Sequence, residues 1–133
     1  MPDQPPRPKD YIRRVLVVED DYDLADLLAD VLTYENCATD IAANGMEALD
    51  RLRDGDYEAV ICDLMMPRFD GEAVYKEIAK HYPHLANKIL FITGHAARPG
   101  GLVDFIYTTS NAILEKPFEM EQLRSALREV FQR

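Results

Sequence analysis

The stretch from Val60 to Asp63 limits what this chain of 133 residues can fold into. Val60, Ile61 and Cys62 form an apolar run that is too short for a helix and ends at the carboxylate of Asp63. A run of this kind, bounded by turn-forming residues, is typical of a strand that is buried on both faces of a sheet. Asp63 then stands at the carboxyl end of its strand, where open α/β sheets place their functional groups.

Similar apolar runs recur along the chain and alternate with stretches of helical periodicity. This alternation predicts a doubly wound α/β fold, in which a five-stranded parallel sheet carries helices on both faces in three layers. The expected strands cover residues 15–18, 38–43, 59–63, 89–92 and 112–114.

The helical stretches predict five helices. The first has apolar residues at helical spacing, and Asp21 and Asp23 place negative charge at its start, where the helix dipole favours it. Gly71 is expected to begin the third helix and Pro83 to end it. Residues 96–101 resist helix formation, so the fourth helix is expected to be short, at about residues 102–108. The apolar residues of the first helix are Leu24, Leu27, Leu28, Val31 and Leu32.

Composition separates a tail from a single domain and excludes several classes of function. Residues 1–13 are rich in proline and are expected to be a tail or linker, whereas residues 14–133 form the domain. A net charge of −9 opposes direct binding to nucleic acid or to an anionic membrane. Cys37 and Cys62 lie in apolar surroundings without metal-ligand spacing, so both are expected to be buried and reduced, as in the cytoplasm. No apolar run is long enough to span a membrane.

Polar residues follow four of the five expected strands. Because the carboxyl ends of parallel strands meet at one edge of a sheet, these groups are expected to share a cleft. Two carboxylates about 4 Å apart repel by about 4 kcal/mol at an effective dielectric of about 20, so several together favour a bound cation. Hard oxygen ligands on a rigid sheet suit Mg²⁺. The residues are Glu19, Asp20 and Asp21 after the first strand, Asp63 after the third, Thr93 after the fourth and Lys116 after the fifth.

These residue types together suit phosphoryl transfer. A metal-neutralised carboxylate such as Asp63 can act as the nucleophile, while Lys116 and the Thr93 hydroxyl bind phosphoryl oxygens. Each residue alone also has an ordinary explanation: one acid can be a helix cap, Thr93 a β-branched strand end, and Lys116 a solvated surface lysine. Pro117 argues for a role of Lys116, because it restricts the residue before it to extended geometry.

The joint pattern resembles the receiver domain of two-component response regulators, over about residues 14–133. The resemblance implies a flavodoxin-like strand order of 2-1-3-4-5, which is carried over from the chemotaxis member that exemplifies this fold. It implies Asp63 as phosphoacceptor, Thr93 as switch hydroxyl, Lys116 as phosphate-binding residue and a cis bond before Pro117. It also implies a site for Mg²⁺ or Mn²⁺, held by Asp63, by Asp20 directly, by Glu19 through water and by the backbone carbonyl of Met65.

The resemblance further implies a signalling protein rather than an enzyme. A phosphohistidine on a sensor histidine kinase or a histidine phosphotransfer protein is the expected donor, and slow autodephosphorylation the only other reaction. The protein is expected to be a monomer or weak dimer. The run of residues 111–118 looks more like the receivers of hybrid sensor kinases than those fused to DNA-binding domains.

Three departures from the family pattern stand out. Ile113 occupies the position where the family often has an aromatic residue, so a coupled threonine–aromatic switch is not expected. Residues 97–111 contain Pro99-Gly100-Gly101, which is expected to weaken the fourth helix and make this segment mobile. Met65 and His95 are expected to flank the path of an attacking water and to tune dephosphorylation.

Two other functions remain open on the sequence. A Mg²⁺-dependent phosphatase of the haloacid dehalogenase type also uses an Asp after a strand, but needs a second Asp two residues later, where this chain has Met65. A nonphosphorylated pseudo-receiver would serve only as an interaction module. A flavin or nucleotide binder is disfavoured, because no Gly-rich phosphate loop follows the first strand.

Overall fold

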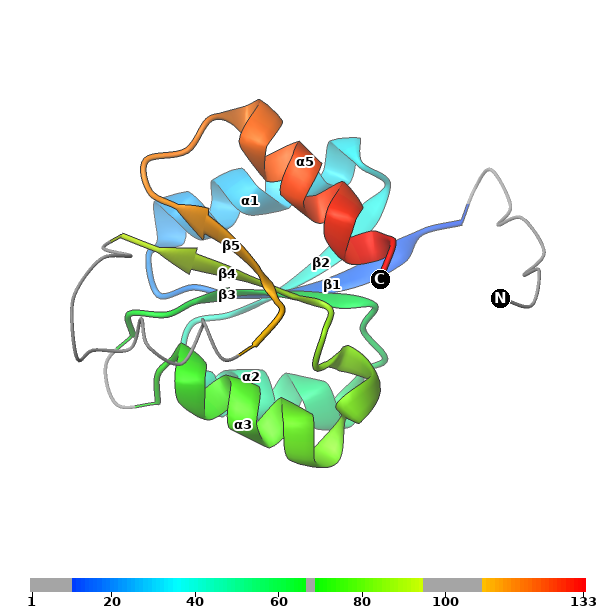
Figure 1. Cartoon of the computed structure of the whole chain (residues 1–133), viewed down its shortest axis with the longest axis vertical. Helices are drawn as coiled ribbons and strands as arrows, with labels where there is room; N and C mark the ends of the chain where they lie inside the picture. Colours follow the sequence, from blue (N-terminus) through cyan, green and yellow to red (C-terminus); the bar gives the residue numbers. More distant parts are fainter. Residues whose placement is uncertain (1–10, 67–68, 95–108) are drawn as a thin grey trace.

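The computed structural model describes residues 11–66, 69–94 and 109–133. Five parallel strands form one sheet in the order β2-β1-β3-β4-β5, which confirms the expected order (Figure 1). Three buried apolar strands, β1, β3 and β4, occupy the centre. The strands are β1 (Arg13–Val18), β2 (Cys37–Ala42), β3 (Ala59–Asp63), β4 (Ile89–Thr93) and β5 (Ala112–Glu115).

The bounds of four strands differ from those expected from the sequence: β4 and β5 each end one residue later, and β1 and β2 differ as follows. β1 begins at Arg13, two residues before the apolar run, because Arg13 pairs with Cys37 in the parallel register. β2 therefore starts at Cys37 and ends at Ala42, one residue earlier at each end than predicted. Backbone pairing extends the strands past the apolar residues, since hydrogen bonding to a neighbour does not require an apolar side chain. Residues 1–10 of the expected tail lie outside the described residues.

Helices cover both faces of the sheet in three layers (Figure 1). On one face lie α1 (Tyr22–Tyr34) and α5 (Met120–Phe131), and on the other α2 (Gly45–Asp54) and α3 (Gly71–His81), followed by the short 3₁₀ helix η1 (Pro83–Leu85). The fourth expected helix and most of the segment 97–111 lie outside the described residues. None of the helices in the described part of the chain is long and apolar enough to cross a membrane.

Side-chain caps begin three of these helices at the site end of the sheet. Asp21 accepts hydrogen bonds from the amides of Asp23 and Leu24 at the start of α1, so one of the three consecutive acids is indeed a cap. Asn44 caps α2 in the same way, and Asp70 caps α3. The helices thus start at defined residues, and α1 begins close to Glu19 and Asp20, which follow β1.

Each face of the sheet has its own apolar core. Leu16 and Val18 of β1 pack toward α2 and α3, whereas Val15 and Val17 pack toward α1 and α5, as the period of two in a strand requires. Leu27 does not join the core of α1 as its spacing suggested: it is 41% exposed on the outer side of the helix. Cys37 and Cys62 are buried and free, as expected.

Candidate functional site

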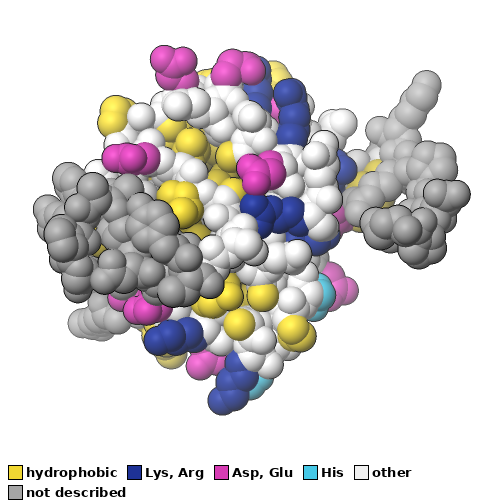
Figure 2. Space-filling model, viewed as in Figure 1, with side chains coloured by type: hydrophobic (Ala, Val, Ile, Leu, Met, Phe, Trp, Pro, Cys, Tyr) yellow, Lys and Arg dark blue, Asp and Glu magenta, His cyan; other side chains and the backbone are white. Residues whose placement is uncertain are grey.

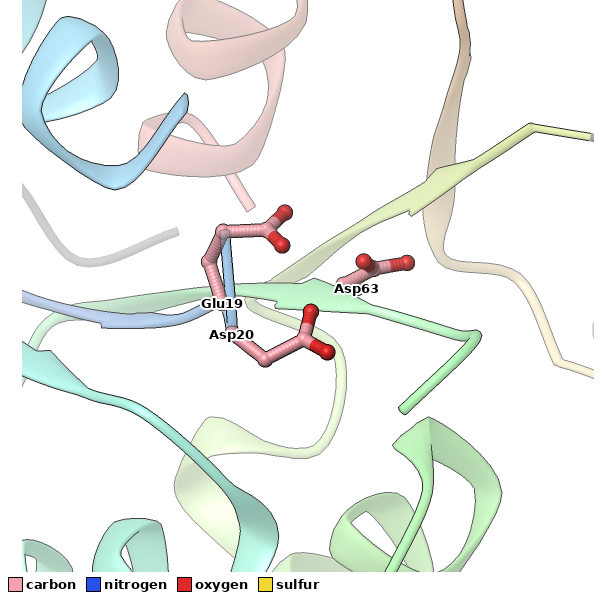
Figure 3. Close-up of side chains that lie close together, drawn as sticks. All are labelled: Glu19, Asp20 and Asp63. Carbon is pink, nitrogen blue, oxygen red and sulfur yellow. The ribbon is translucent and has the colours of Figure 1, made fainter. Parts of the chain in front are cut away.

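Three carboxylates meet at the carboxyl ends of β1 and β3. Glu19 and Asp20 directly follow β1, and Asp63 is the last residue of β3. β1 and β3 are neighbours in the sheet, so their ends lie side by side. One carboxylate oxygen of each residue lies within 4.8 Å of the others, and the side chains of Glu19, Asp20 and Asp63 point into a common space (Figure 3).

The two carboxylate oxygens of Glu19 are both buried, but they differ in their hydrogen bonding. Its side chain is buried, with one oxygen, Oε2, accepting a hydrogen bond from the amide of Asp21 at 3.1 Å. The other oxygen, Oε1, is buried and has no hydrogen-bond partner among the residues that the structure describes. Burial, with a further contribution from the charge of Asp63, raises the pKa of Glu19 to about 8. A buried carboxylate oxygen that accepts no hydrogen bond from the described residues, beside two other carboxylates, fits a divalent cation bound among them.

Asp63 has its two oxygens in different surroundings. The carboxylate is buried, and Oδ1 accepts a hydrogen bond from the backbone amide of Met65 at 3.0 Å. Oδ2 faces the ammonium group of Lys116, with 3.4 Å between Nζ and Oδ2. The side chain is therefore oriented from two sides, by a loop amide and by a cation from another strand.

Lys116 reaches this carboxylate from the end of β5. Its backbone amide donates to the carbonyl of Thr93 at 2.7 Å, which continues the pairing of β5 with β4 past Glu115. The ammonium group also lies 3.8 Å from Oε1 of Glu19, so it is shared between two buried acids. The peptide bond between Lys116 and Pro117 is cis, as the resemblance implied.

Thr93 ends the strand between those of Asp63 and Lys116. It is buried, and it follows Ile92, the residue that pairs with Asp63 in the sheet. Its own partner in β5 is Glu115, the residue before Lys116. The sheet thus brings Thr93 to the same edge as the acids, whereas His95, expected to flank this site, lies outside the described residues.

Met65 contributes in a way that the sequence did not reveal. Its side chain is 50% exposed, and its backbone amide donates a hydrogen bond to Asp63. The amide of Asp21 has the same function for Glu19. An Asp that accepts a hydrogen bond from the amide two residues later is a common local motif, so the spacing of Asp63 and Met65 could have indicated this contact.

The arrangement has the parts that phosphoryl transfer to a carboxylate requires. Asp63 offers an oriented carboxylate, the Lys116 ammonium lies beside both Asp63 and Glu19, and the carboxylates of Glu19, Asp20 and Asp63 form a group that could hold a cation. An attacking carboxylate and a phosphoryl group are both anionic, so positive charge around them lowers the barrier.

The family model of the response regulator receiver domain matches residues 15–128. The response regulator ArlR of Staphylococcus haemolyticus is 30% identical over 119 residues, which are 90% of this chain and 52% of that protein. The transcriptional regulatory protein TcrA of Mycobacterium tuberculosis is 32% identical over 127 residues, 90% of this chain and 46% of that protein. The chain thus spans about half the length of these curated relatives.

Solved structures agree with this match. The response regulator TrrA of Thermotoga maritima, in complex with Mg²⁺-BeF, is 30% identical with a TM-score of 0.76, over 89% of this chain and 98% of that one. NtrX of Brucella abortus, in complex with ADP, is 29% identical with a TM-score of 0.78, over 92% of this chain and 26% of that one. The chemotaxis protein CheY4 of Vibrio cholerae, at 24% identity and a TM-score of 0.79 over 90% of this chain and 99% of that one, shares the fold. The chain belongs to the response regulator receiver domain family of two-component signalling.

Proposed function

We propose that Asp63 is the phosphoacceptor of this receiver domain and takes its phosphoryl group from a phosphohistidine. The observation that carries the proposal is the position of Lys116 Nζ, 3.4 Å from Asp63 Oδ2 on the side opposite the amide of Met65. In the transfer, a carboxylate oxygen of Asp63 forms a bond to phosphorus while the bond from phosphorus to the histidine nitrogen breaks. The electron pair leaves with the imidazole, and the product is an acyl phosphate.

Each neighbouring residue has a distinct part in this proposal. Lys116 binds a phosphoryl oxygen as a cation, and the Thr93 hydroxyl donates a hydrogen bond to another. Asp20 directly, Glu19 through water, and the carbonyl of Met65 hold Mg²⁺ or Mn²⁺ together with Asp63. The metal supplies positive charge that offsets the repulsion between carboxylate and phosphoryl group. The Mg²⁺-BeF complex of TrrA, a relative of similar sequence, supports this assignment.

The partners follow from the same chemistry. A sensor histidine kinase or a histidine phosphotransfer protein is the proposed donor, and the domain is proposed to be a monomer or weak dimer in the cytoplasm, where Cys37 and Cys62 stay reduced. Figure 2 shows basic and acidic side chains interspersed on the described part of one face, without a continuous basic patch. Together with the net charge of −9, this supports an output that does not contact nucleic acid through this domain.

The same site disfavours turnover of external phosphoesters. A phosphatase of the haloacid dehalogenase type needs a general acid two residues after the nucleophile, and the Met65 thioether cannot transfer a proton. We therefore propose that the domain catalyses only its own phosphorylation and a slow autodephosphorylation. A pseudo-receiver role is disfavoured because the acceptor carboxylate, cation and acid cluster are all in place.

The test is an intact-mass measurement after incubation with acetyl phosphate and Mg²⁺. The wild-type protein should gain one phosphoryl group that hydroxylamine removes, as expected of an acyl phosphate. Asp63→Asn should gain none, whereas the matched control Asp23→Asn, an exposed acid in the first turn of α1, should be labelled like wild type. Full labelling of Asp63→Asn would show that another residue is the acceptor. Sustained hydrolysis of a small phosphoester would instead favour the phosphatase.

A further inference from the structure

The first residue of α2 lies against the loop that follows Asp63. Gly45 is buried at the start of α2, and Phe69 packs directly on it. A Cβ atom at residue 45 would lie 2.3 Å from Cδ1, 2.5 Å from the carbonyl oxygen and 2.9 Å from Cβ of Phe69. Side-chain carbons do not approach other heavy atoms closer than about 3.0 Å, so only glycine permits this contact.

Phe69 belongs to the connection between β3 and α3, which carries the groups around the acceptor. At its first end, the Met65 amide donates to Asp63, and at its second end Asp70 caps α3. The amide of Gly71 donates to the carbonyl of Leu64 at 3.3 Å, which closes the connection into a loop. Between these ends, Phe69 packs into the core on the α2 and α3 side of the sheet.

The loop, rather than α2, would yield to a larger residue at position 45. α2 is held by Ala48 and Leu52, which are buried in the core, and by the side-chain cap of Asn44. Figure 1 shows α2 and α3 side by side on the same face of the sheet, so α2 has little room to move inward. Restoring a 3.0 Å contact from 2.5 Å at the Phe69 carbonyl requires a backbone shift of at least 0.5 Å.

We propose that Gly45 is a positioning residue for the phosphoacceptor loop. By admitting the Phe69 ring and carbonyl, it sets where Phe69 and the following residues lie, and the hydrogen bond from the Gly71 amide to the Leu64 carbonyl passes this position on to the amide of Met65 beside Asp63. The predicted effect on phosphorylation rests on the proposed function of Asp63. The predicted position of the Met65 amide does not, and it can be measured in the metal-free protein. Displacements below 1 Å at a reacting centre are enough to lower rates by about an order of magnitude.

Three variants test this proposal. Gly45→Ala should shift the amide resonances of Leu64 and Met65 in the metal-free protein, weaken binding of Mg²⁺ alone about tenfold and slow labelling by acetyl phosphate about tenfold. Phe69→Ala, which removes the ring from the other side of the contact, should change the same three quantities in the same direction. The double variant should be less impaired than the sum of the two, because both act on one contact.

The matched control is Gly55→Ala at the opposite end of the same helix. A Cβ there would meet Arg14 and Tyr57 at 3.2 Å, so it crowds its neighbours without touching the loop. The Mg²⁺ affinity and the labelling rate of this variant should be within twofold of the wild-type values, even if its thermal stability is lower. Experiments are run well below the melting temperature of each variant.

The outcomes separate this proposal from the proposed function. Unchanged Leu64 and Met65 amides and unchanged Mg²⁺ affinity in Gly45→Ala would overturn the positioning role, as would an equal loss in Gly55→Ala. If Gly45→Ala does not fold, Phe69→Ala alone decides, and wild-type values there would overturn it. Absence of acyl phosphate on wild-type Asp63 would overturn the proposed function, while the amide shifts would still test the position of the loop.

Discussion

Lys116 Nζ lies 3.4 Å from Oδ2 of Asp63, although 53 residues separate the two in the sequence. The parallel order β3-β4-β5 makes this possible, because each strand delivers its last residues to the same edge. The ammonium group thus lies beside the carboxylates of Asp63 and Glu19, and the Lys116 side chain is only 34% exposed.

Replacing Lys116 by Met should reduce the rate of labelling by acetyl phosphate about a hundredfold, since one charged donor to the phosphoryl oxygens is lost. Binding of Mg²⁺ should be retained or become tighter, because a competing positive charge beside Glu19 and Asp63 is removed. The measurements are intact mass over time and a Mg²⁺ titration. Lys80→Met, an exposed lysine of α3, is the control. Labelling at the wild-type rate would mean that Lys116 does not bind the phosphoryl group.

Glu19→Gln should flatten the pH dependence of stability in EDTA. The pKa of Glu19 is about 8 in the folded protein and 4.5 as the ordinary value, so between these pH values the folded state binds more protons than the unfolded state. Stability therefore falls as pH rises from about 4.5 to 8, and the glutamine variant lacks this contribution. Thermal melts of both proteins across this range provide the measurement. Parallel curves for the two proteins would contradict the raised pKa.

Tyr57→Phe should raise the pKa of Asp40 toward its ordinary value. The Tyr57 hydroxyl donates to Asp40 Oδ2 at 2.6 Å and is the largest cause of the lowered pKa, followed among favourable contacts by Arg14 at 2.9 Å. A lowered pKa stabilises the fold above the ordinary value of 3.8, and this contribution is lost as pH falls through the folded pKa.

We expect Tyr57→Phe to cost about 1 kcal/mol in the free energy of unfolding near neutral pH. The difference from wild type should shrink under acid, when Asp40 is protonated in both proteins. A carboxyl NMR titration of Asp40 and urea unfolding at both pH values are the measurements. Tyr34→Phe, an exposed tyrosine at the end of α1, is the control and should leave both quantities unchanged.

Asn36 connects α1 to β2 with a φ of 59°, in the left-handed region. Its carbonyl also accepts a hydrogen bond from the amide of Arg13 at 3.2 Å, so this conformation is fixed by the start of the sheet. Asn36→Gly should leave stability within a few tenths of a kcal/mol, whereas Asn36→Val should cost more than about 1 kcal/mol. Urea unfolding compares them. Equal stability of the valine and glycine variants would show that the turn adopts another conformation.

The apolar runs of the sequence located four strand ends and the polar residues at them to within one residue, because a buried strand needs an apolar stretch. Asp63 and Thr93 end their strands, and Glu19 and Lys116 follow theirs directly. The strand order came from the resemblance to receiver domains and not from the runs themselves. Periodicity does not encode which strand lies next to which.

Local sequence patterns predicted strand bounds and buried residues less reliably where contacts with a neighbouring strand or with the sheet determine them. β1 and β2 extend to Arg13 and Cys37 because these residues pair with each other, which no single run shows. Leu27 fits the helical spacing of α1, yet it is 41% exposed, because the helix axis relative to the sheet determines which residues face the core.

By itself, the sequence determined the alternation of strands and helices and the residue types at the site edge, since both depend on short-range hydrophobic patterning. Only the tertiary structure decided that Glu19 is buried beside Asp63, that Lys116 reaches both of these acids, and that Phe69 rests on Gly45. These features depend on distances between elements far apart in the chain, and such distances are set by packing and strand register.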